Sequence, residues 1–298
     1  MDKFCMLSLL TVGLLHDAFC NPQVERSIEM KRQIGVQHVF GGRLALPSEF
    51  PHLAAIGFIR RFKLHWLCGG TLINERFVLT AAHCLEDNRY RAYGKAVRVR
   101  LGDIDLKSSA DDAFAQQIKV LRRITHPDYK YPMTYHDVGL IELEQPAAFN
   151  QFVQPACLHT TRDIMPSQAQ VVGWGLTEKE SDAGAKKLNE VTIDILNIER
   201  CTVITDRIDK SLRDMLLSEN LLDESMICAG VLAGGKDSCS GDSGGPLQIN
   251  STREGCRVEV VGIVSFGLGA CGAVNTPAVY VRVSHYVPWI QNYTNILH

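Results

Sequence analysis

Gly241-Asp242-Ser243-Gly244-Gly245-Pro246 surrounds a single serine with glycines. Glycine adopts backbone conformations that other residues avoid, so this segment can turn sharply. The turn would also leave the backbone N–H groups of Gly241 and Ser243 free to point at a bound molecule. A glycine-rich turn with one serine is normally only a turn, so the segment gains meaning from partners elsewhere in the chain.

Two other segments offer such partners. Leu79-Thr80-Ala81-Ala82-His83-Cys84 ends an apolar run with a histidine between small residues, and His136-Asp137-Val138-Gly139-Leu140-Ile141 begins an apolar strand with an aspartate. An unpaired carboxylate is costly to bury, so Asp137 needs a partner, and a histidine N–H would serve. A nucleophile, a base and a group that orients the base are what the hydrolysis of an amide bond requires.

In the order His, Asp, Ser, these segments resemble the signature segments of the chymotrypsin/trypsin family. The resemblance runs from Val39 to about Ile296 and includes Val39-Phe40-Gly41-Gly42, Gly173-Trp174-Gly175 and Ser265-Phe266-Gly267. It implies an all-β fold of two six-stranded antiparallel β-barrels packed face to face, with a C-terminal α-helix. The barrels would span about residues 39–150 and 151–298, with the active site between them.

The resemblance also implies a catalytic role for each site residue. His83, Asp137 and Ser243 would form the triad, with His83 as the base and Asp137 fixing its tautomer. The amides of Gly241 and Ser243 would form the oxyanion hole. The chain is therefore expected to be a serine endopeptidase that acts through an acyl-enzyme. The alternative is a catalytically weak or silent homologue that binds or regulates other proteins.

The resemblance places a specificity pocket six residues before the nucleophile. Asp237 matches the pocket base of trypsin-like members, where a carboxylate receives Arg or Lys. Gly267 matches the glycine at the pocket mouth, which lets an extended substrate pair with the backbone. Ala278 stands where glycine is usual, and its methyl group would project toward Asp237. We therefore expect cleavage after Arg or Lys, with reduced turnover or an altered Arg/Lys ratio.

The loops after Cys84 and between Cys201 and Cys228 are longer than in digestive trypsins. Both would border the cleft, so selection beyond the first subsite is expected rather than digestive breadth. A protease of this kind resembles arthropod cascade-type or venom enzymes without a clip domain. Its expected partners are protein or peptide substrates, an activating protease and protein inhibitors, and a monomer without cofactors is expected.

Charge and hydropathy limit the other classes of partner. The formal net charge is -2, with acidic and basic residues interspersed, so no field gathers nucleic acid or an anionic membrane. An apolar stretch from Met6 to Leu15, followed by small residues at 18 and 20, is typical of a secretory signal peptide. Residues 1–20 are thus a predicted signal peptide, 21–38 a propeptide and 39–298 a secreted, extracellular protease domain.

Activation in the family exposes a new N-terminal amine, here that of Val39. The amine would pair with Asp242 beside the nucleophile and order the oxyanion turn and the pocket. The residue before Val39 is His38 rather than Arg or Lys. An activator that accepts His38, or a two-step nick and trim, is therefore expected instead of self-activation.

Ten cysteines are present, and those outside the signal peptide are even in number, which predicts a disulfide framework in an oxidising compartment. No pair has the spacing of a structural zinc site, and no metal is expected. Composition alone cannot choose among the possible pairings. The resemblance implies Cys68–Cys84, Cys201–Cys228 and Cys239–Cys271. Cys157 and Cys256 remain; they bridge each other, or Cys157 pairs with Cys20.

Short apolar runs between turn-forming residues are typical of β-barrels or sandwiches. The expected strands cover 53–59, 71–80, 97–101, 117–124, 138–143, 170–173, 190–196, 246–249, 258–265 and 278–283. Helical spacing predicts a loop helix over 211–222 and a C-terminal helix over 284–297.

Three surface features complete the sequence. Asn250-Ser251-Thr252 and Asn292-Tyr293-Thr294 are glycosylation sequons, usable in a secreted chain. Asp103, Asp105, Asp111 and Asp112 lie in a segment that resembles the calcium loop of some family members. Carboxylates in a surface loop are usually solvated, so calcium there is the weaker interpretation.

Overall fold

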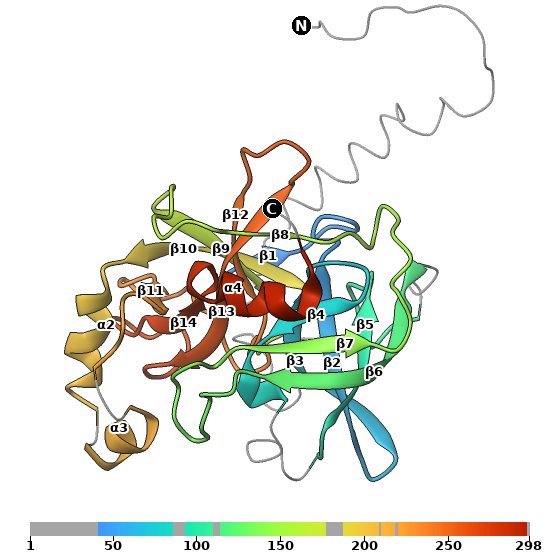
Figure 1. Ribbon diagram of the computed structural model, residues 1–298. Helices are drawn as coiled ribbons and strands as arrows, with labels where there is room; N and C mark the ends of the chain where they lie inside the picture. Colours follow the sequence, from blue (N-terminus) through green and yellow to red (C-terminus); the bar gives the residue numbers. More distant parts are fainter. Residues whose placement is uncertain are drawn as a thin grey trace, which may run out of the picture. The chain divides into compact units, whose positions relative to one another are not determined.

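The computed structural model describes residues 41–85, 93–109, 114–176, 187–208, 210–217 and 220–296 (Figure 1). Short strands dominate these residues and form two closed antiparallel barrels, which confirms the predicted fold class. Apolar side chains from both barrels and from the C-terminal helix share one buried cluster. The barrels are therefore joined by a continuous core.

The first barrel closes in the order β2–β3–β4–β7–β6–β5. Each strand buries an apolar run, and Phe58, Leu79 and Leu140 are almost fully shielded from solvent. The strands are β2 (Leu53–Arg60), β3 (Lys63–Leu72), β4 (Phe77–Thr80), β5 (Ala96–Leu101), β6 (Gln116–Thr125) and β7 (Gly139–Leu143). Between β4 and β7, the short 3-10 helix η1 (Ala82–Cys84) leaves the end of β4.

The second barrel closes through pairing of β9 with both β10 and β12. Two short strands are added to it: β1 (Arg43–Leu44) pairs with β10, and β8 (Cys157–Leu158) lies parallel to β13. The barrel strands are β9 (Gln168–Gly173), β10 (Asn189–Leu196), β11 (Met226–Gly230), β12 (Pro246–Asn250), β13 (Val258–Gly267) and β14 (Ala278–Arg282).

Helices lie outside the barrels. The predicted C-terminal helix is present as α4 (Val283–Thr294), which contacts β8 and β13 and buries Tyr286, Val287 and Ile290. In the segment between β10 and β11, α2 (Ile198–Thr205) and α3 (Lys210–Leu216) occur, so α3 covers only part of the predicted loop helix. Among the described helices, none combines the length and apolar character that a bilayer crossing requires.

One predicted strand was wrong. The run 71–80 is divided between β3 and β4, because the chain turns at Asn74. The side-chain oxygen of Asn74 accepts hydrogen bonds from the amides of Arg76 (2.9 Å) and Phe77 (2.7 Å). Such a local turn competes with strand pairing. The first half of β3 and all of β11 escaped prediction because their glycines and cysteines interrupt the alternation of residue types.

Disulfides join neighbouring parts of the chain. The structure contains the bonds Cys68–Cys84, Cys157–Cys256, Cys201–Cys228 and Cys239–Cys271. Cys157 thus pairs with Cys256, and Cys20 lies outside the described residues. Within the described part of the chain, no disulfide connects the first barrel to the second.

A buried polar contact lies between the barrels instead. The ring nitrogen Nε2 of His52, just before β2, lies 2.6 Å from the side-chain oxygen of Gln248 in β12. Burial lowers the pKa of His52 to about 4, so the imidazole is neutral near pH 7 and its Nε2–H donates to Gln248. This hydrogen bond fixes the register of one barrel against the other.

Candidate active site

His83 and Asp137 lie together in the structure. His83 is in η1 and Asp137 precedes β7, both nearly inaccessible to solvent. The Nδ1 atom of His83 lies 2.7 Å from Oδ2 of Asp137, and the His83 amide donates to Oδ1 at 2.8 Å. The carboxylate therefore holds both the imidazole ring and the backbone that carries it.

A third donor, the hydroxyl of Ser265 in β13, lies 2.5 Å from Oδ2 of Asp137. Asp137 therefore has donors from both barrels, which compensate the carboxylate for the loss of water. The other imidazole nitrogen, Nε2 of His83, is buried and makes no hydrogen bond within the described residues. With Nδ1–H donated to Asp137, Nε2 carries the lone pair that can accept a proton.

The Ser243 turn is fixed against the first barrel. The carbonyl of Ser243 accepts a hydrogen bond from the amide of Gly69 in β3 at 2.8 Å. Gly244 has φ +78°, and a Cβ atom there would come within 2.1 Å of the Thr80 hydroxyl oxygen. Only glycine satisfies both conditions, which explains why the turn needs a glycine after the serine. Cys68, next to Gly69, is bonded to Cys84, next to His83.

The two candidate oxyanion donors are unpaired. Gly241 has φ +106°, a conformation that favours glycine. In the described part of the chain, neither the Gly241 amide nor the Ser243 amide donates a hydrogen bond to another group. Both N–H groups are therefore available to an oxygen atom bound at this turn.

Asp237 is buried close to the Ser243 turn. Its Oδ2 accepts a hydrogen bond from the amide of Gly272 at 3.1 Å, whereas Oδ1 is buried without a partner among the described residues. Burial raises the pKa of Asp237 from 3.8 to about 6. A buried carboxylate oxygen without a donor is strongly unfavourable, so this position favours a cationic ligand.

The walls near Asp237 come from β13 and β14. Gly267 pairs with Ala278 across these strands, and Ala278 is 2% exposed. The hydroxyl groups of Ser238 and Tyr280 lie 3.0 Å apart next to Asp237 in the chain and in β14. The predicted pocket residues thus come from one edge of the second barrel.

Asp242 is fully buried behind the Ser243 turn. Its carboxylate accepts hydrogen bonds from the amides of Gly175 (2.7 Å) and Cys239 (2.9 Å). A Cβ atom at Gly173 or Gly175 would come within 2.2 Å of the carboxylate, so both glycines allow its close approach. Burial raises the pKa of Asp242 to about 6. The predicted cleavage site, His38 and Val39, lies outside the described residues.

Comparison with known proteins decides the family. The family model described as trypsin matches residues 39–290. The chain belongs to the trypsin family. Its triad residues, pocket aspartate and serine turn all lie within the matched region.

The relatives of this trypsin-family chain include several arthropod proteins. It is 34% identical to the clotting factor G beta subunit of Tachypleus tridentatus, over 87% of this chain and 80% of that subunit. It is 35% identical to the serine protease snk of Drosophila melanogaster, over 85% of this chain. It is 37% identical to phenoloxidase-activating enzyme 1 of Spodoptera litura, also over 85%. The expected resemblance to arthropod cascade-type proteases is confirmed. The chain spans 56% and 66% of the latter two relatives.

Two contacts of the trypsin-family site were not foreseen from the sequence. The Ser265 hydroxyl is one, although Ser265 begins a motif quoted above. The other is an aromatic cluster beside Asp137: the ring of His136 stacks on that of His126 at 4.9 Å, and the hydroxyl of Tyr286 lies 3.1 Å from Nδ1 of His136. His136 has φ +54°. Only the adjacency of His136 to Asp137 signalled a role.

Metal chemistry finds no support in the described residues. The sole grouping of ligand-type side chains there is Cys68, His83 and Cys84. Both sulfurs belong to one disulfide, so they are not thiolate ligands. Asp103 is paired with Arg100 and accepts a hydrogen bond from the amide of Asp105 at 2.8 Å. Asp111 and Asp112 lie outside the described residues.

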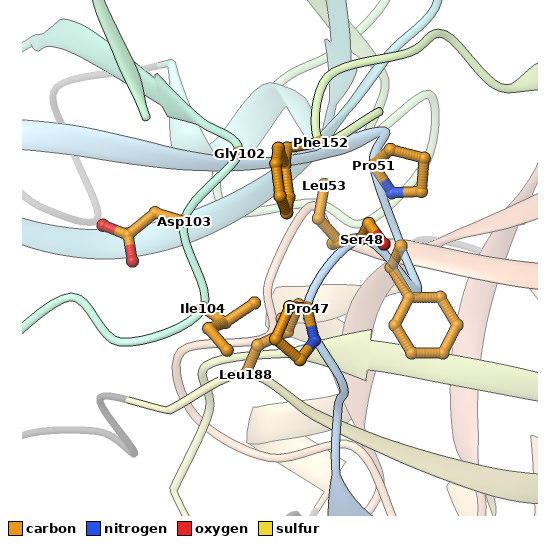
Figure 2. Close-up of a pocket in the computed structure, with 10 residues that line it drawn as sticks. Pro47, Ser48, Pro51, Leu53, Gly102, Asp103, Ile104, Phe152 and Leu188 are labelled. Atoms are coloured by element: carbon orange, nitrogen blue, oxygen red, sulfur yellow. The ribbon is translucent and has the colours of Figure 1, made fainter. Parts of the chain in front are cut away.

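An apolar hollow near β1 is separate from this site. Figure 2 shows that the carboxylate of Asp103 turns away from the other side chains that line it. No triad or pocket residue is among its lining, which consists of Pro47, Ser48, Phe50, Pro51, Leu53, Gly102, Asp103, Ile104, Phe152 and Leu188. The hollow therefore offers no group for catalysis. Both sequon asparagines, Asn250 and Asn292, are exposed.

Proposed function

We propose that this chain is a secreted serine endopeptidase zymogen that, once activated, hydrolyses protein substrates after Arg or Lys. The observation that carries the proposal is the pairing of His83 with Asp137. It binds Nδ1 of His83 and leaves Nε2 without a partner among the described residues. A histidine with one nitrogen oriented and the other vacant is prepared to act as a general base.

The reaction follows from these groups. Nε2 of His83 takes the proton of the Ser243 hydroxyl while the serine oxygen attacks the scissile carbonyl. The amides of Gly241 and Ser243 bind the oxyanion that forms. Histidine then gives its proton to the leaving amine, and the acyl-enzyme remains. Water, deprotonated by the same nitrogen, attacks the ester and releases the acid and Ser243.

Specificity for Arg or Lys rests on Asp237. Its unpaired Oδ1 and raised pKa describe a carboxylate that gains most from a cationic side chain. An Arg or Lys side chain that reaches Asp237 would place the next carbonyl at the Ser243 turn, with Gly267 available to backbone pairing. Ala278 narrows this pocket by one methyl group compared with a glycine.

Activation is proposed to occur between His38 and Val39, after removal of signal peptide 1–20 and with 21–38 as the propeptide of the 39–298 domain. The new amine would replace solvation that the buried Asp242 lacks. Cleavage after Arg32 alone would leave six extra residues, about 20 Å of extended chain, and the amine could not reach its pocket. The activated monomer would meet substrates, an activating protease and protein inhibitors outside the cell.

A fluorophosphonate probe and positional scanning of peptide cleavage test this proposal together. Activated protein should be labelled at Ser243 and should cleave after Arg or Lys. Ser243→Ala should abolish both signals without preventing secretion, because it removes one oxygen from the turn. Absence of labelling and of cleavage in activated wild-type protein would instead favour a silent homologue.

A further inference from the structure

The hairpin between β2 and β3 ends in a turn that combines an aromatic ring with cationic side chains. Arg60 pairs with Lys63 across the two strands, so Arg61 and Phe62 form the turn. The side chain of Phe62 is fully exposed, and Arg61 and Lys63 are exposed beside it. In Figure 1 this hairpin extends beyond the rest of the first barrel. One exposed apolar side chain is unremarkable by itself, but this one stands among three positive charges.

The turn holds an unfavourable backbone conformation. Arg61 has φ +50° and Phe62 has φ +65°. Two-residue turns of this hand favour asparagine and glycine, and bulky residues rarely adopt them. The base of the turn is anchored, because the Arg60 guanidinium lies 4.9 Å from the ring centroid of Tyr93. Strained residues gather at binding sites, and this strain presents the Phe62 ring outward.

The tip carries positive charge that its surroundings do not neutralise. No acidic residue occurs from 53 to 74, nor in the neighbouring strand β5. Arg61 and Lys63 form no ion pair with any residue that the structure describes. On the same barrel, by contrast, Arg122 is paired with Glu142 at 2.8 Å. The tip therefore attracts acidic groups.

The strand β3 leads from the tip to the candidate active site. Lys63 and Cys68 are five residues apart, about 17 Å along an extended strand. Cys68 is bonded to Cys84, the neighbour of His83. Asp237 lies on the second barrel, so residues before the scissile bond lie toward that barrel and those after it leave across the first. An extended peptide would reach the tip about five residues after the scissile bond.

We infer that the hairpin tip, Arg60 to Lys63, binds an acidic segment of the protein substrate about four to seven residues after the scissile bond. This inference rests on the proposed function. Its cations would pair with carboxylates, while Phe62 would contact an apolar side chain among them. Stable membrane anchoring needs more than one exposed ring and a few charges, and the short path to the site favours substrate.

The experiment compares three substrates of the activated full chain. Two peptides share one Arg–X bond, and carry either glutamates or glutamines at the fourth to seventh positions after it. The third is a tripeptide amide that ends in a chromophore directly after Arg. The glutamate peptide should have a kcat/KM about tenfold above the glutamine peptide. This advantage should decrease as ionic strength rises.

Three variants separate the tip from the general charge of the protein. Lys63→Glu should abolish the preference for the glutamate peptide and leave the tripeptide amide unaffected. Phe62→Asn should reduce the preference, because asparagine tolerates the left-handed turn but lacks the ring. Arg76→Glu is the matched control, since it reverses one exposed charge at the other end of β3. It should retain the preference.

Each outcome decides a different question. If wild type cleaves the amide but treats both peptides equally, the inference is wrong and the proposed function stands. If Arg76→Glu lowers the preference as much as Lys63→Glu, the whole barrel and not the tip attracts acid, which also overturns it. Binding to phosphatidylcholine–phosphatidylserine vesicles that requires Phe62, without a peptide preference, would make the tip a membrane element. If wild type cleaves nothing, the proposed function fails and the inference with it.

Discussion

The hydroxyl of Ser265 donates to the same Asp137 oxygen that the imidazole of His83 contacts, at 2.5 and 2.7 Å. Ser265 belongs to the second barrel and His83 to the first. The orientation of the candidate base is therefore coupled to the packing of the two barrels. Loss of the hydroxyl would leave the carboxylate one donor short in a buried site.

Ser265→Ala should lower kcat about 3- to 30-fold, because a hydrogen bond to a charged group contributes roughly 1–3 kcal/mol. The matched control is Ser251→Ala, which removes a hydroxyl donated to Glu259 at 2.7 Å outside the site. Both variants should unfold at lower urea concentration. Only Ser265→Ala should also lose turnover on a peptide amide, and equal turnover in the two variants would assign Ser265 a structural role alone.

Binding of an aromatic amidine should depend on pH through Asp237. The cation binds the ionised carboxylate, whose pKa is raised to about 6 by burial. Affinity should therefore be full above about pH 7 and should fall by up to about tenfold per pH unit below 6. Asp237→Ser removes this slope and reveals any contribution of other groups. A wild-type inhibition constant that is constant between pH 5 and 7 would contradict the assignment of Asp237 to the pocket.

Ala278→Gly should raise kcat on Arg or Lys substrates, because it removes the methyl group expected to project toward Asp237. It should also lower the free energy of unfolding by roughly 0.5–1 kcal/mol, since glycine weakens a strand. Ala229, which faces Ala278 across β11 and β14, provides the control. Ala229→Gly should show the stability loss without the gain in turnover. A drop or no change in turnover for Ala278→Gly would refute this account of the pocket wall.

Activation should change the dependence of stability on pH. The carboxyl of Asp242 has a folded pKa of about 6, above its ordinary 3.8. Its contribution to the free energy of unfolding is full below about pH 4 and is lost as pH rises through 6. In the activated enzyme the Val39 amine would pair with the carboxylate, so this loss should be smaller.

Urea unfolding at pH 5 and pH 8 checks this prediction with zymogen and activated enzyme in parallel. The zymogen should lose on the order of 2 kcal/mol more than the activated enzyme between these conditions. Asp237 titrates in both forms and cancels in the difference. Identical losses would mean that no amine reaches Asp242, and an N-terminus other than Val39 in Edman sequencing would confirm that failure.

Local patterns in the sequence predicted both barrels and the proximity of His83 to Asp137. These features depend on strand-length apolar runs and on motifs that need each other chemically. The contact of His52 with Gln248 was beyond prediction, because the two residues are 196 positions apart and neither belongs to a local motif. The turn at Asn74 was missed because an apolar run on either side outweighed one polar side chain. Ser265 needed the folded arrangement, since a serine in a strand reveals nothing about the carboxylate it meets.

The absence of a described disulfide between the barrels has a mechanical consequence. Each barrel is locked within itself, whereas the two halves of the active site are aligned by noncovalent contacts such as His52 with Gln248. Hydrostatic pressure or mild denaturant should part this seam before either half melts. Catalysis would then disappear and return reversibly while the circular dichroism of both halves persists, so the enzyme would act as a gauge of its own docking.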